Sequence, residues 1–361
     1  MRPYFSPSSV PHLNPWRRNT PAISFPSTDI SHKESIKKIM IEQYGISVEA
    51  IKKINRGSAN VFEIFSKGSH YILKEFQSKI DIDKIKIEYM VVEHLRRDGV
   101  TTPKYILNKN GELYFEFNKR LLIVQKFIEG QVVDSNTSNQ EQIIESACVY
   151  GKIIKSLENF KYELPDFKRH YMSKELCEQD IKNIEQLIKI NKNKYVNDAL
   201  LHKRKILLKL KDLDYTWQNK LTYKKSHGDY TVTQFIYNDK ENIEAIVDWV
   251  STRKIPVARE LIRNYFFMAK EIKKQNVNFE FFLEYIKEFE KYQELNDYDL
   301  KYMPLLYLIE LSRTIYGYEQ YVYNNLVEYL DFGNKLYNQC LCVEKNSDEL
   351  SRELLKLKKC K

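Results

Sequence analysis

Cysteine is scarce in this sequence, and long apolar runs are missing. The 361 residues include five scattered cysteines, and Cys340 and Cys342 lack the two-residue gap and the second ligand pair of a zinc site. We therefore expect reduced thiols, without disulfides or structural zinc. No apolar stretch approaches the length of a membrane span, and the N-terminus has no continuous apolar signal core. These absences predict a soluble, cytoplasmic protein without a membrane partner.

Lysine is missing from residues 1–31, although it is abundant elsewhere, and this segment contains six of the ten prolines. Because proline fixes φ and has no backbone N–H, such a segment does not form a regular helix or sheet. We interpret residues 1–34 as a flexible tail, or as residues foreign to the native chain, with little weight in the function.

The sequence also lacks a basic stripe with interleaved aromatic residues. The formal net charge is +9 at pH 7, but basic residues alternate with acidic ones along most predicted helices, which is typical of solvated faces. No nucleic-acid-binding motif is present, so we expect no nucleic-acid partner. The composition, 43% hydrophobic and 30% charged, excludes a disordered chain and predicts two lobes or domains with a large core.

The most specific pattern lies at about residues 221–250. Asp229 follows Gly228 on a predicted tight turn, the amide residue Gln234 comes five positions later, and Asp248 ends a later apolar run. Two short apolar strands between Gln234 and Asp248 predict a hairpin that brings both side chains to the same end. Phosphoryl transfer needs a carboxylate at the acceptor hydroxyl, and an amide and a carboxylate on the metal that binds the phosphates. We therefore interpret Asp229 as the catalytic residue, and Gln234 and Asp248 as the metal ligands.

The motif His-Gly-Asp at 227–229, with an amide five residues after the aspartate, and the motif Ile-Val-Asp-Trp at 246–249 carry a family resemblance. They resemble the aminoglycoside phosphotransferase and choline kinase-like superfamily of small-molecule kinases. Homoserine kinase-like and spore-coat kinase-like proteins belong to the same superfamily. The resemblance extends from about residue 50 to about residue 268, and it implies an α+β, bilobal, protein-kinase-like fold.

This fold assigns a role to each part of the chain after the tail. Residues 35–128 would form an N-lobe with a small antiparallel sheet that binds ATP. Residues 129–361 would form a mostly helical C-lobe with the catalytic hairpin and the acceptor site. Within the C-lobe, the sequence pattern predicts one helix over 303–329 and another over 347–358.

Upstream motifs follow the order expected for the nucleotide site. A strand, glycine turn and strand at 54–64 resemble the loop that covers the phosphates, and Lys74 in the following strand is implied to bind the α- and β-phosphates. A carboxylate on the next helix would hold this lysine; Glu88 is favoured over Glu93, which comes later on the helix. The segment 123–130 resembles the hinge between the two lobes, whose backbone would contact the adenine of ATP. The implied nucleotide-binding residues are Gly57, Ser58, Asn60, Lys74, Glu88, Gln125 and Phe127.

One position departs from the family, because Gln234 stands where the amide residue is usually asparagine. Glutamine carries the same carbonyl oxygen one methylene further out, whereas Mg²⁺ requires near-octahedral geometry at short distances, so the backbone must shift or the ligand must act through water. The resemblance implies ATP- and Mg²⁺-dependent transfer of the γ-phosphate to a hydroxyl of a small molecule, such as an aminoglycoside-like antibiotic, an amino alcohol or a sugar. The alternative is a catalytically weakened kinase fold that serves as a binding or structural protein, similar to the spore-coat relatives.

The sequence also suggests roles for four further residues near this site. His227 is expected to be a structural hydrogen-bonding residue beside the turn, and Glu260 is expected to brace the turn from the start of a helix. Glu310 and Glu319 are candidates to bind a cationic acceptor, although acidic residues on helices ordinarily face solvent. The sequence does not indicate an oligomeric state.

Overall fold

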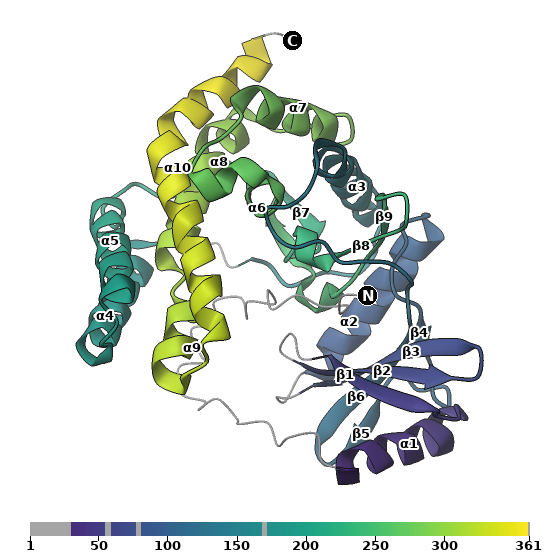
Figure 1. The fold of residues 1–361 in the computed structure, drawn as a ribbon. Helices are drawn as coiled ribbons and strands as arrows, with labels where there is room; N and C mark the ends of the chain where they lie inside the picture. Colours follow the sequence, from purple (N-terminus) through teal and green to yellow (C-terminus); the bar gives the residue numbers. More distant parts are fainter. Residues whose placement is uncertain (1–29, 55–58, 77–80, 168–171, 360–361) are drawn as a thin grey trace.

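The computed structural model describes residues 30–54, 59–76, 81–167 and 172–359 (Figure 1). Most of the predicted tail (1–34), and the predicted phosphate-loop residues Gly57 and Ser58, lie outside these ranges. Within them, the chain forms a sheet-containing N-terminal lobe and a mostly helical C-terminal lobe. The predicted α+β, bilobal, protein-kinase-like fold is confirmed.

The N-terminal lobe is built on a six-stranded antiparallel sheet. The strand order is β1-β2-β3-β6-β4, and β5 also pairs with β6. Helix α1, at the purple end of the chain in Figure 1, lies against one side of this sheet. The elements of this lobe are α1 (Ile30–Tyr44), β1 (Ala50–Ile54), β2 (Ala59–Ser66), β3 (Ser69–Phe76), α2 (Ile82–Arg97), β4 (Tyr105–Ile106), β5 (Phe115–Phe117) and β6 (Arg120–Lys126).

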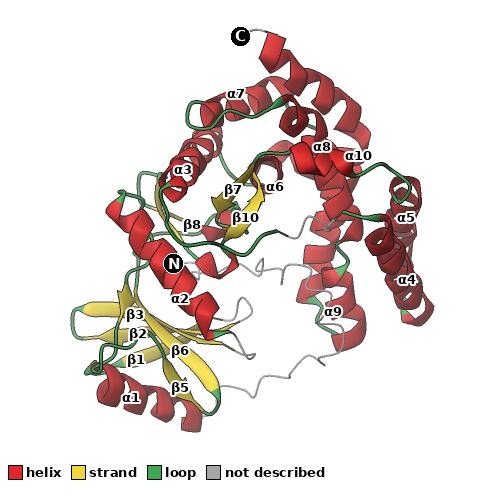
Figure 2. Ribbon diagram, turned by 180° about the vertical axis from the view of Figure 1, so that it is seen from behind, coloured by secondary structure: helices red, strands yellow, loops and turns green. Residues whose placement is uncertain are grey.

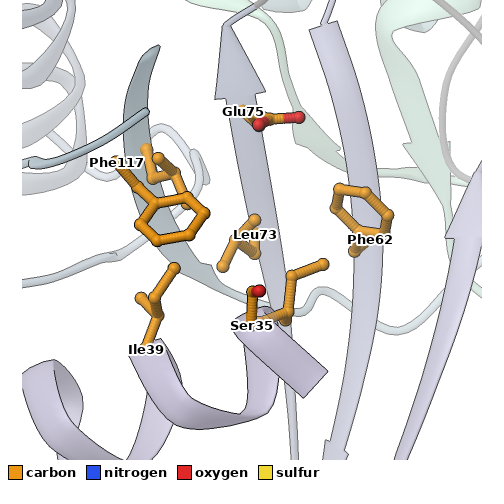
Figure 3. Close-up of a pocket in the computed structure, with 8 residues that line it drawn as sticks. Ser35, Ile39, Phe62, Leu73, Glu75 and Phe117 are labelled. Carbon is orange, nitrogen blue, oxygen red and sulfur yellow. The ribbon is translucent and has the colours of Figure 1, made fainter. Parts of the chain in front are cut away.

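The two faces of this sheet have different partners. Residues directly opposite each other in antiparallel strands point to the same face, and the opposite pair Phe62 and Leu73 packs beneath α1. Figure 3 shows this outer face, where Phe62, Leu73 and Glu75 line a small pocket under α1. The next pair along the strands, Val61 and Lys74, points to the inner face, where Val61 packs against residues of the C-terminal lobe.

The C-terminal lobe consists of helices around two short antiparallel strand pairs, β7 with β10 and β8 with β9 (Figure 2). Helix α3 packs against α7, and α8 packs against both α6 and α10. The β8–β9 pair is the predicted catalytic hairpin. The elements are α3 (Gln140–Glu158), α4 (Lys174–Ile190), α5 (Lys194–Leu210), β7 (Tyr223–Ser226), β8 (Phe235–Tyr237), β9 (Ile243–Ile246), β10 (Arg253–Pro256), α6 (Val257–Met268), α7 (Phe279–Glu290), α8 (Asp297–Arg313), α9 (Tyr316–Asn324) and α10 (Glu328–Lys359), with short 3-10 turns η2 (Thr216–Lys220), η3 (Val232–Gln234), η4 (Trp249–Ser251) and η5 (Lys270–Lys274).

The C-terminal helices differ from the sequence prediction. The single helix predicted over 303–329 is two helices, α8 and α9, and α10 is much longer than the predicted 347–358. Helix α8 begins at Asp297, before the predicted start at 303, because Asn296 forms a capping box there. Helices α9 and α10 approach closely, since a Cβ atom on Gly317 would lie 2.6 Å from the backbone nitrogen of Gly333. A local hydrophobic pattern does not report such a contact between distant segments.

Two composition-based expectations can be compared with the described residues. Among the helices in these ranges, none combines the length and the apolar character needed to cross a bilayer. Cys148, Cys177, Cys340 and Cys342 are free thiols, and Cys360 lies outside the described residues.

Candidate functional site

The turn that carries Asp229 follows β7 and depends on Gly228. Its φ of +82° lies in the left-handed region that glycine adopts at little cost. A Cβ atom on Gly228 would lie 2.0 Å from the carbonyl oxygen of Ser251. The turn therefore packs directly against the backbone of η4, and no side chain fits between them.

His227 connects this turn to the end of the β8–β9 hairpin through hydrogen bonds. The Asp229 backbone N–H donates to His227 Nδ1 at 3.2 Å, and Nε2 lies 2.9 Å from the Val247 carbonyl oxygen. This pattern fits a neutral ring that carries its proton on Nε2. Burial lowers the pKa of His227, which also favours the neutral form. The structural role expected for His227 is confirmed.

Glu260, in the first turn of α6, holds the turn from its other side. Its Oε1 accepts from the Tyr230 backbone N–H at 3.0 Å, and its Oε2 accepts from the Tyr150 hydroxyl at 3.1 Å and from the Ser226 hydroxyl. All four residues are fully buried. The bracing role expected for Glu260 is confirmed, because its carboxylate joins both ends of the turn.

The Asp229 carboxylate is buried and is contacted on both oxygens. Oδ1 lies 2.6 Å from Arg263 Nη1, and Oδ2 accepts from Gln234 Nε2 at 3.2 Å. Burial raises the pKa of Asp229 to about 7, although the Arg263 guanidinium opposes this shift. A carboxylate with such a pKa suits general-base catalysis near neutrality. The sequence analysis did not identify Arg263. The sequence does contain a sign of its role, because Arg259 and Arg263 are two charged residues one turn apart on a predicted helix of mostly apolar residues.

Gln234 and Asp248 lie at the same end of the β8–β9 hairpin, as predicted. The Val247 N–H donates to the Gln234 carbonyl oxygen at 2.9 Å, and Phe235 pairs with Ile246 next to them. Asp248 then leaves the hairpin in a left-handed conformation, with φ 66° and ψ 56°. A non-glycine residue in this conformation is a common feature of functional sites.

Lys74 brings the N-terminal lobe to the same place. Its Nζ lies 3.6 Å from Asp248 Oδ1. Glu88 of α2 is also buried beside this pair: burial raises the pKa of Glu88, the charge of Lys74 opposes the rise and the charge of Asp248 adds to it. Glu93, the competing choice, instead pairs with Arg96 at 3.2 Å near the surface. Helix α2 therefore turns Glu88, and not Glu93, toward Lys74.

The other predicted nucleotide-binding residues occupy different places. Asn60 is directly opposite Glu75 and donates to it at 2.6 Å, on the sheet face away from Lys74. The structure therefore does not bring the Asn60 side chain to the site. Gln125 is buried in β6, and the Phe127 N–H donates to the His70 carbonyl oxygen at 3.0 Å, at the start of the link to the C-terminal lobe.

Glu310 differs from both sequence-based alternatives. It is buried, and Arg259 donates to its two oxygens at 2.6 and 2.7 Å. It therefore neither faces solvent nor offers a carboxylate to a cationic acceptor, because a buried arginine already neutralises it. Glu319 lies half-buried on α9.

Replacing Gly228 by alanine is expected to lower the free energy of unfolding by about 2–5 kcal/mol, since a left-handed conformation and a backbone clash add their costs. Gly68→Ala is the matched control. Gly68 also has a positive φ, of 66°, but an added Cβ atom there would meet nothing within 4 Å, so the expected loss is about 1–2 kcal/mol. Urea unfolding of both variants measures the difference. Equal losses would show that the approach to Ser251 relaxes easily.

Comparisons with known proteins place this geometry in context. The model of the phosphotransferase enzyme family matches residues 50–295. A search of the curated proteins finds no match. Spectinomycin phosphotransferase, solved in complex with ADP and spectinomycin, is 15% identical with a TM-score of 0.62, over 89% of this chain and 98% of that chain.

Two further solved structures are kinases of small molecules by name. Amicoumacin kinase, solved with AMP-PNP and Ca²⁺, is 16% identical with a TM-score of 0.56, over 86% of this chain and 92% of that chain. A microcompartment-associated aminopropanol kinase is 11% identical with a TM-score of 0.60, over 88% of this chain and 98% of that chain. At such identities the likeness concerns the fold.

Proposed function

Because this chain belongs to the phosphotransferase enzyme family, we propose that it transfers the γ-phosphate of ATP to a hydroxyl group of a small molecule. One observation carries the proposal: side chains from both lobes meet in one place. Lys74 of the N-terminal lobe lies 3.6 Å from Asp248, and Gln234 donates to Asp229 at the same end of the hairpin. Together they supply a phosphate contact, two metal ligands and a base, which are the parts that phosphoryl transfer needs.

An apolar cluster next to the lysine, where the two lobes meet, supports a nucleotide as the phosphate donor. Val61 and Ile72, on the inner face of the sheet, pack with Ile236 and Val247 of the β8–β9 hairpin, and Phe127 borders this cluster. Ligand sites typically combine such apolar walls with a few polar groups. The first four side chains are 0–3% exposed, so a purine would pack at the border of this cluster, near Phe127, and its polar edge would meet the backbone that links the lobes.

The residues around Asp248 fit a magnesium ion. Mg²⁺ is usually held by one or two carboxylates together with phosphates and water. In the ranges that the structure describes, no group of three or more histidine, cysteine, aspartate or glutamate side chains is placed to hold a metal ion. Gln234 directs its amide nitrogen to Asp229, so its carbonyl oxygen is the atom for the metal. When bound, the ion would neutralise charge on the phosphate oxygens.

In this mechanism, the chain's own residues orient the acceptor and hold the phosphates. Asp229 accepts the acceptor hydroxyl's hydrogen bond and then its proton, which a pKa of about 7 permits near neutrality. Lys74 contacts the phosphates from a strand that packing keeps rigid. His227 and Glu260 fix the backbone of the turn, so the Asp229 carboxylate keeps its place during the reaction.

The acceptor is a small molecule in this proposal, and the short link after Asp248 supports this choice. Only η4 and β10 separate Asp248 from α6, which leaves no long segment there to bind a peptide. The acceptors we propose are an aminoglycoside-like antibiotic, an amino alcohol or a sugar. Spectinomycin, amicoumacin and aminopropanol in the names of the structural neighbours support this range.

A screen with purified protein, Mg-ATP and a panel of aminoglycosides, amino alcohols, sugars and homoserine tests the proposal. We expect ADP release that depends on one acceptor class, with a product that gains one phosphate by mass spectrometry. The same screen with the Asp229→Asn variant is the negative control. If ATP binds but no acceptor is phosphorylated, the catalytically weakened alternative is favoured.

Replacing Gln234 by asparagine is expected to preserve most of the activity, because asparagine keeps the carbonyl ligand. Replacing Gln234 by alanine is expected to lower kcat by about 10–100-fold, since both the metal ligand and the contact with Asp229 are lost. Gln293→Asn, at a residue whose side chain donates to the Glu294 carbonyl oxygen and lies outside the proposed site, is the control. Steady-state kinetics at varied Mg²⁺ measures the effect. An alanine variant with unchanged Mg²⁺ dependence would remove Gln234 from the metal site.

A further inference from the structure

Four buried charged side chains, one of which is the Asp229 carboxylate, lie in contact between α6, α8 and the turn at Gly228. We call Arg259, Arg263, Glu310 and Asp229 the α6–α8 charge network. Their relative exposures are 2%, 4%, 7% and 2%. Arg259 binds both oxygens of Glu310, Arg263 Nε lies 3.8 Å from Glu310 Oε1, and Arg263 Nη1 lies 2.6 Å from Asp229 Oδ1. Two positive and two negative charges thus form one connected chain from α8 to the catalytic turn.

The position of Arg263 is fixed from several sides. Its guanidinium lies over the Phe267 ring, 5.1 Å from the ring centroid, and between the carboxylates of Glu310 and Asp229. Arg259, one turn earlier on α6, holds Glu310 with two short hydrogen bonds. A planar guanidinium with little freedom to rotate restricts the orientation of the carboxylate that it contacts.

Stability alone is a weak explanation for this network. Replacing a buried ion pair by well-packed apolar residues is often neutral or stabilising, because desolvation offsets the attraction. The contact at Asp229 has a more specific consequence. Arg263 forms an ion pair with Oδ1 while Gln234 donates a hydrogen bond to Oδ2, so two partners from different elements contact the two oxygens of the carboxylate.

We propose that Arg263 is a positioning residue that orients the Asp229 carboxylate toward the acceptor hydroxyl, and that Glu310 and Arg259 hold Arg263 in place. This inference rests on the proposed function and adds a residue to it. Arg263 acts through Asp229, and its described contacts, with Asp229, Glu310 and Phe267, include neither Lys74 nor Asp248. Its loss should therefore affect the transition state more than nucleotide binding.

Kinetics of Arg263→Met, which keeps length and removes the charge and the donors, tests the proposal. We expect kcat to fall by about 100-fold, as for a misplaced catalytic group, while the Kd for Mg-ATP stays within about twofold. Arg263→Lys should recover part of this loss, because it keeps the charge but not the planar geometry. If Arg263→Met does not fold, Arg263→Gln takes its place with the same expectation.

A matched control separates positioning from stability. Arg313 of α8 is also a buried arginine, 4% exposed, and its Nε lies 2.5 Å from Asp180 Oδ2. It contacts no residue of the proposed site among the described interactions. Arg313→Met is expected to lower the melting temperature without changing kcat for the folded protein.

The outcomes decide between the two conclusions. A lowered kcat with unchanged nucleotide affinity, and partial recovery in Arg263→Lys, supports the positioning role. An unchanged kcat in Arg263→Met, or an equal loss of kcat and nucleotide affinity, overturns it. If the unaltered protein phosphorylates no acceptor, the proposed function fails, and crystal structures then decide the positioning role. A displaced Asp229 carboxylate in Arg263→Met supports this role, and an unmoved one overturns it.

Discussion

Replacing Asp229 by asparagine is expected to lower kcat by about 10²–10⁴-fold and to leave the Kd for Mg-ATP nearly unchanged. The amide has almost the same shape, but it cannot accept the proton of the acceptor hydroxyl. In the proposed mechanism Asp229 contacts the acceptor hydroxyl, whereas Lys74 and Asp248 bind the phosphates and the metal, so the substitution should affect the transition state more than nucleotide binding. Acceptor-dependent ADP release measures kcat, and calorimetric titration measures Kd.

Asp239→Asn is the control for this change. Asp239 is exposed in the turn of the same hairpin, so the same substitution there should leave kcat and Kd unchanged. Retention of more than a small fraction of the rate in Asp229→Asn would remove Asp229 from the role of base. A large loss of ATP affinity would instead place Asp229 at the nucleotide.

Replacing Asp248 by alanine is expected to abolish the Mg²⁺-dependent part of nucleotide binding. In the unaltered protein, ATP at about 100 times its Kd should add about 2.7 kcal/mol to the free energy of unfolding, and this gain should be larger with Mg²⁺ than with EDTA. A carboxylate is the preferred ligand of a hard cation, and Lys74 also loses its partner at 3.6 Å. The variant should therefore show the same small thermal shift with Mg²⁺ and with EDTA.

Glu244→Ala provides the comparison for Asp248→Ala. Glu244 is an exposed carboxylate on β9 of the same hairpin, so its removal should preserve the difference between Mg²⁺ and EDTA. A nucleotide-dependent shift that is equal with and without Mg²⁺ in the unaltered protein, and is unaffected by Asp248→Ala, would favour the catalytically weakened alternative.

The β8–β9 hairpin shows how much a short stretch of sequence can encode. Two apolar runs joined by a turn predicted that Gln234 and Asp248 share one end, and the Val247 hydrogen bond to Gln234 confirms this register. The turn at Gly228 was predictable for the same reason. These features depend on interactions between residues close in sequence, where backbone geometry and side-chain alternation fix the outcome.

Position along the helix was the basis for choosing Glu88 over Glu93, which comes later on α2. The two residues are five positions apart on α2 and therefore do not share a face. The sequence favoured Glu88 as the partner of Lys74, and the structure buries Glu88 where the charges of Lys74 and Asp248 act on its pKa. The helix pattern alone did not show which sheet face α2 would meet.

Sequence alone determined the bilobal fold, the turn at Gly228 and the β8–β9 hairpin of this protein, together with its resemblance to small-molecule kinases. Tertiary structure decided that Asn60 points away from Lys74, that Glu310 is neutralised by Arg259, and that Arg263 contacts Asp229. The reason is distance along the chain. Turns, strands and helix faces follow from residues a few positions apart, whereas the partner of a buried charge is chosen when separate elements pack, and a charged side chain has the same local pattern whether it meets solvent or an opposite charge.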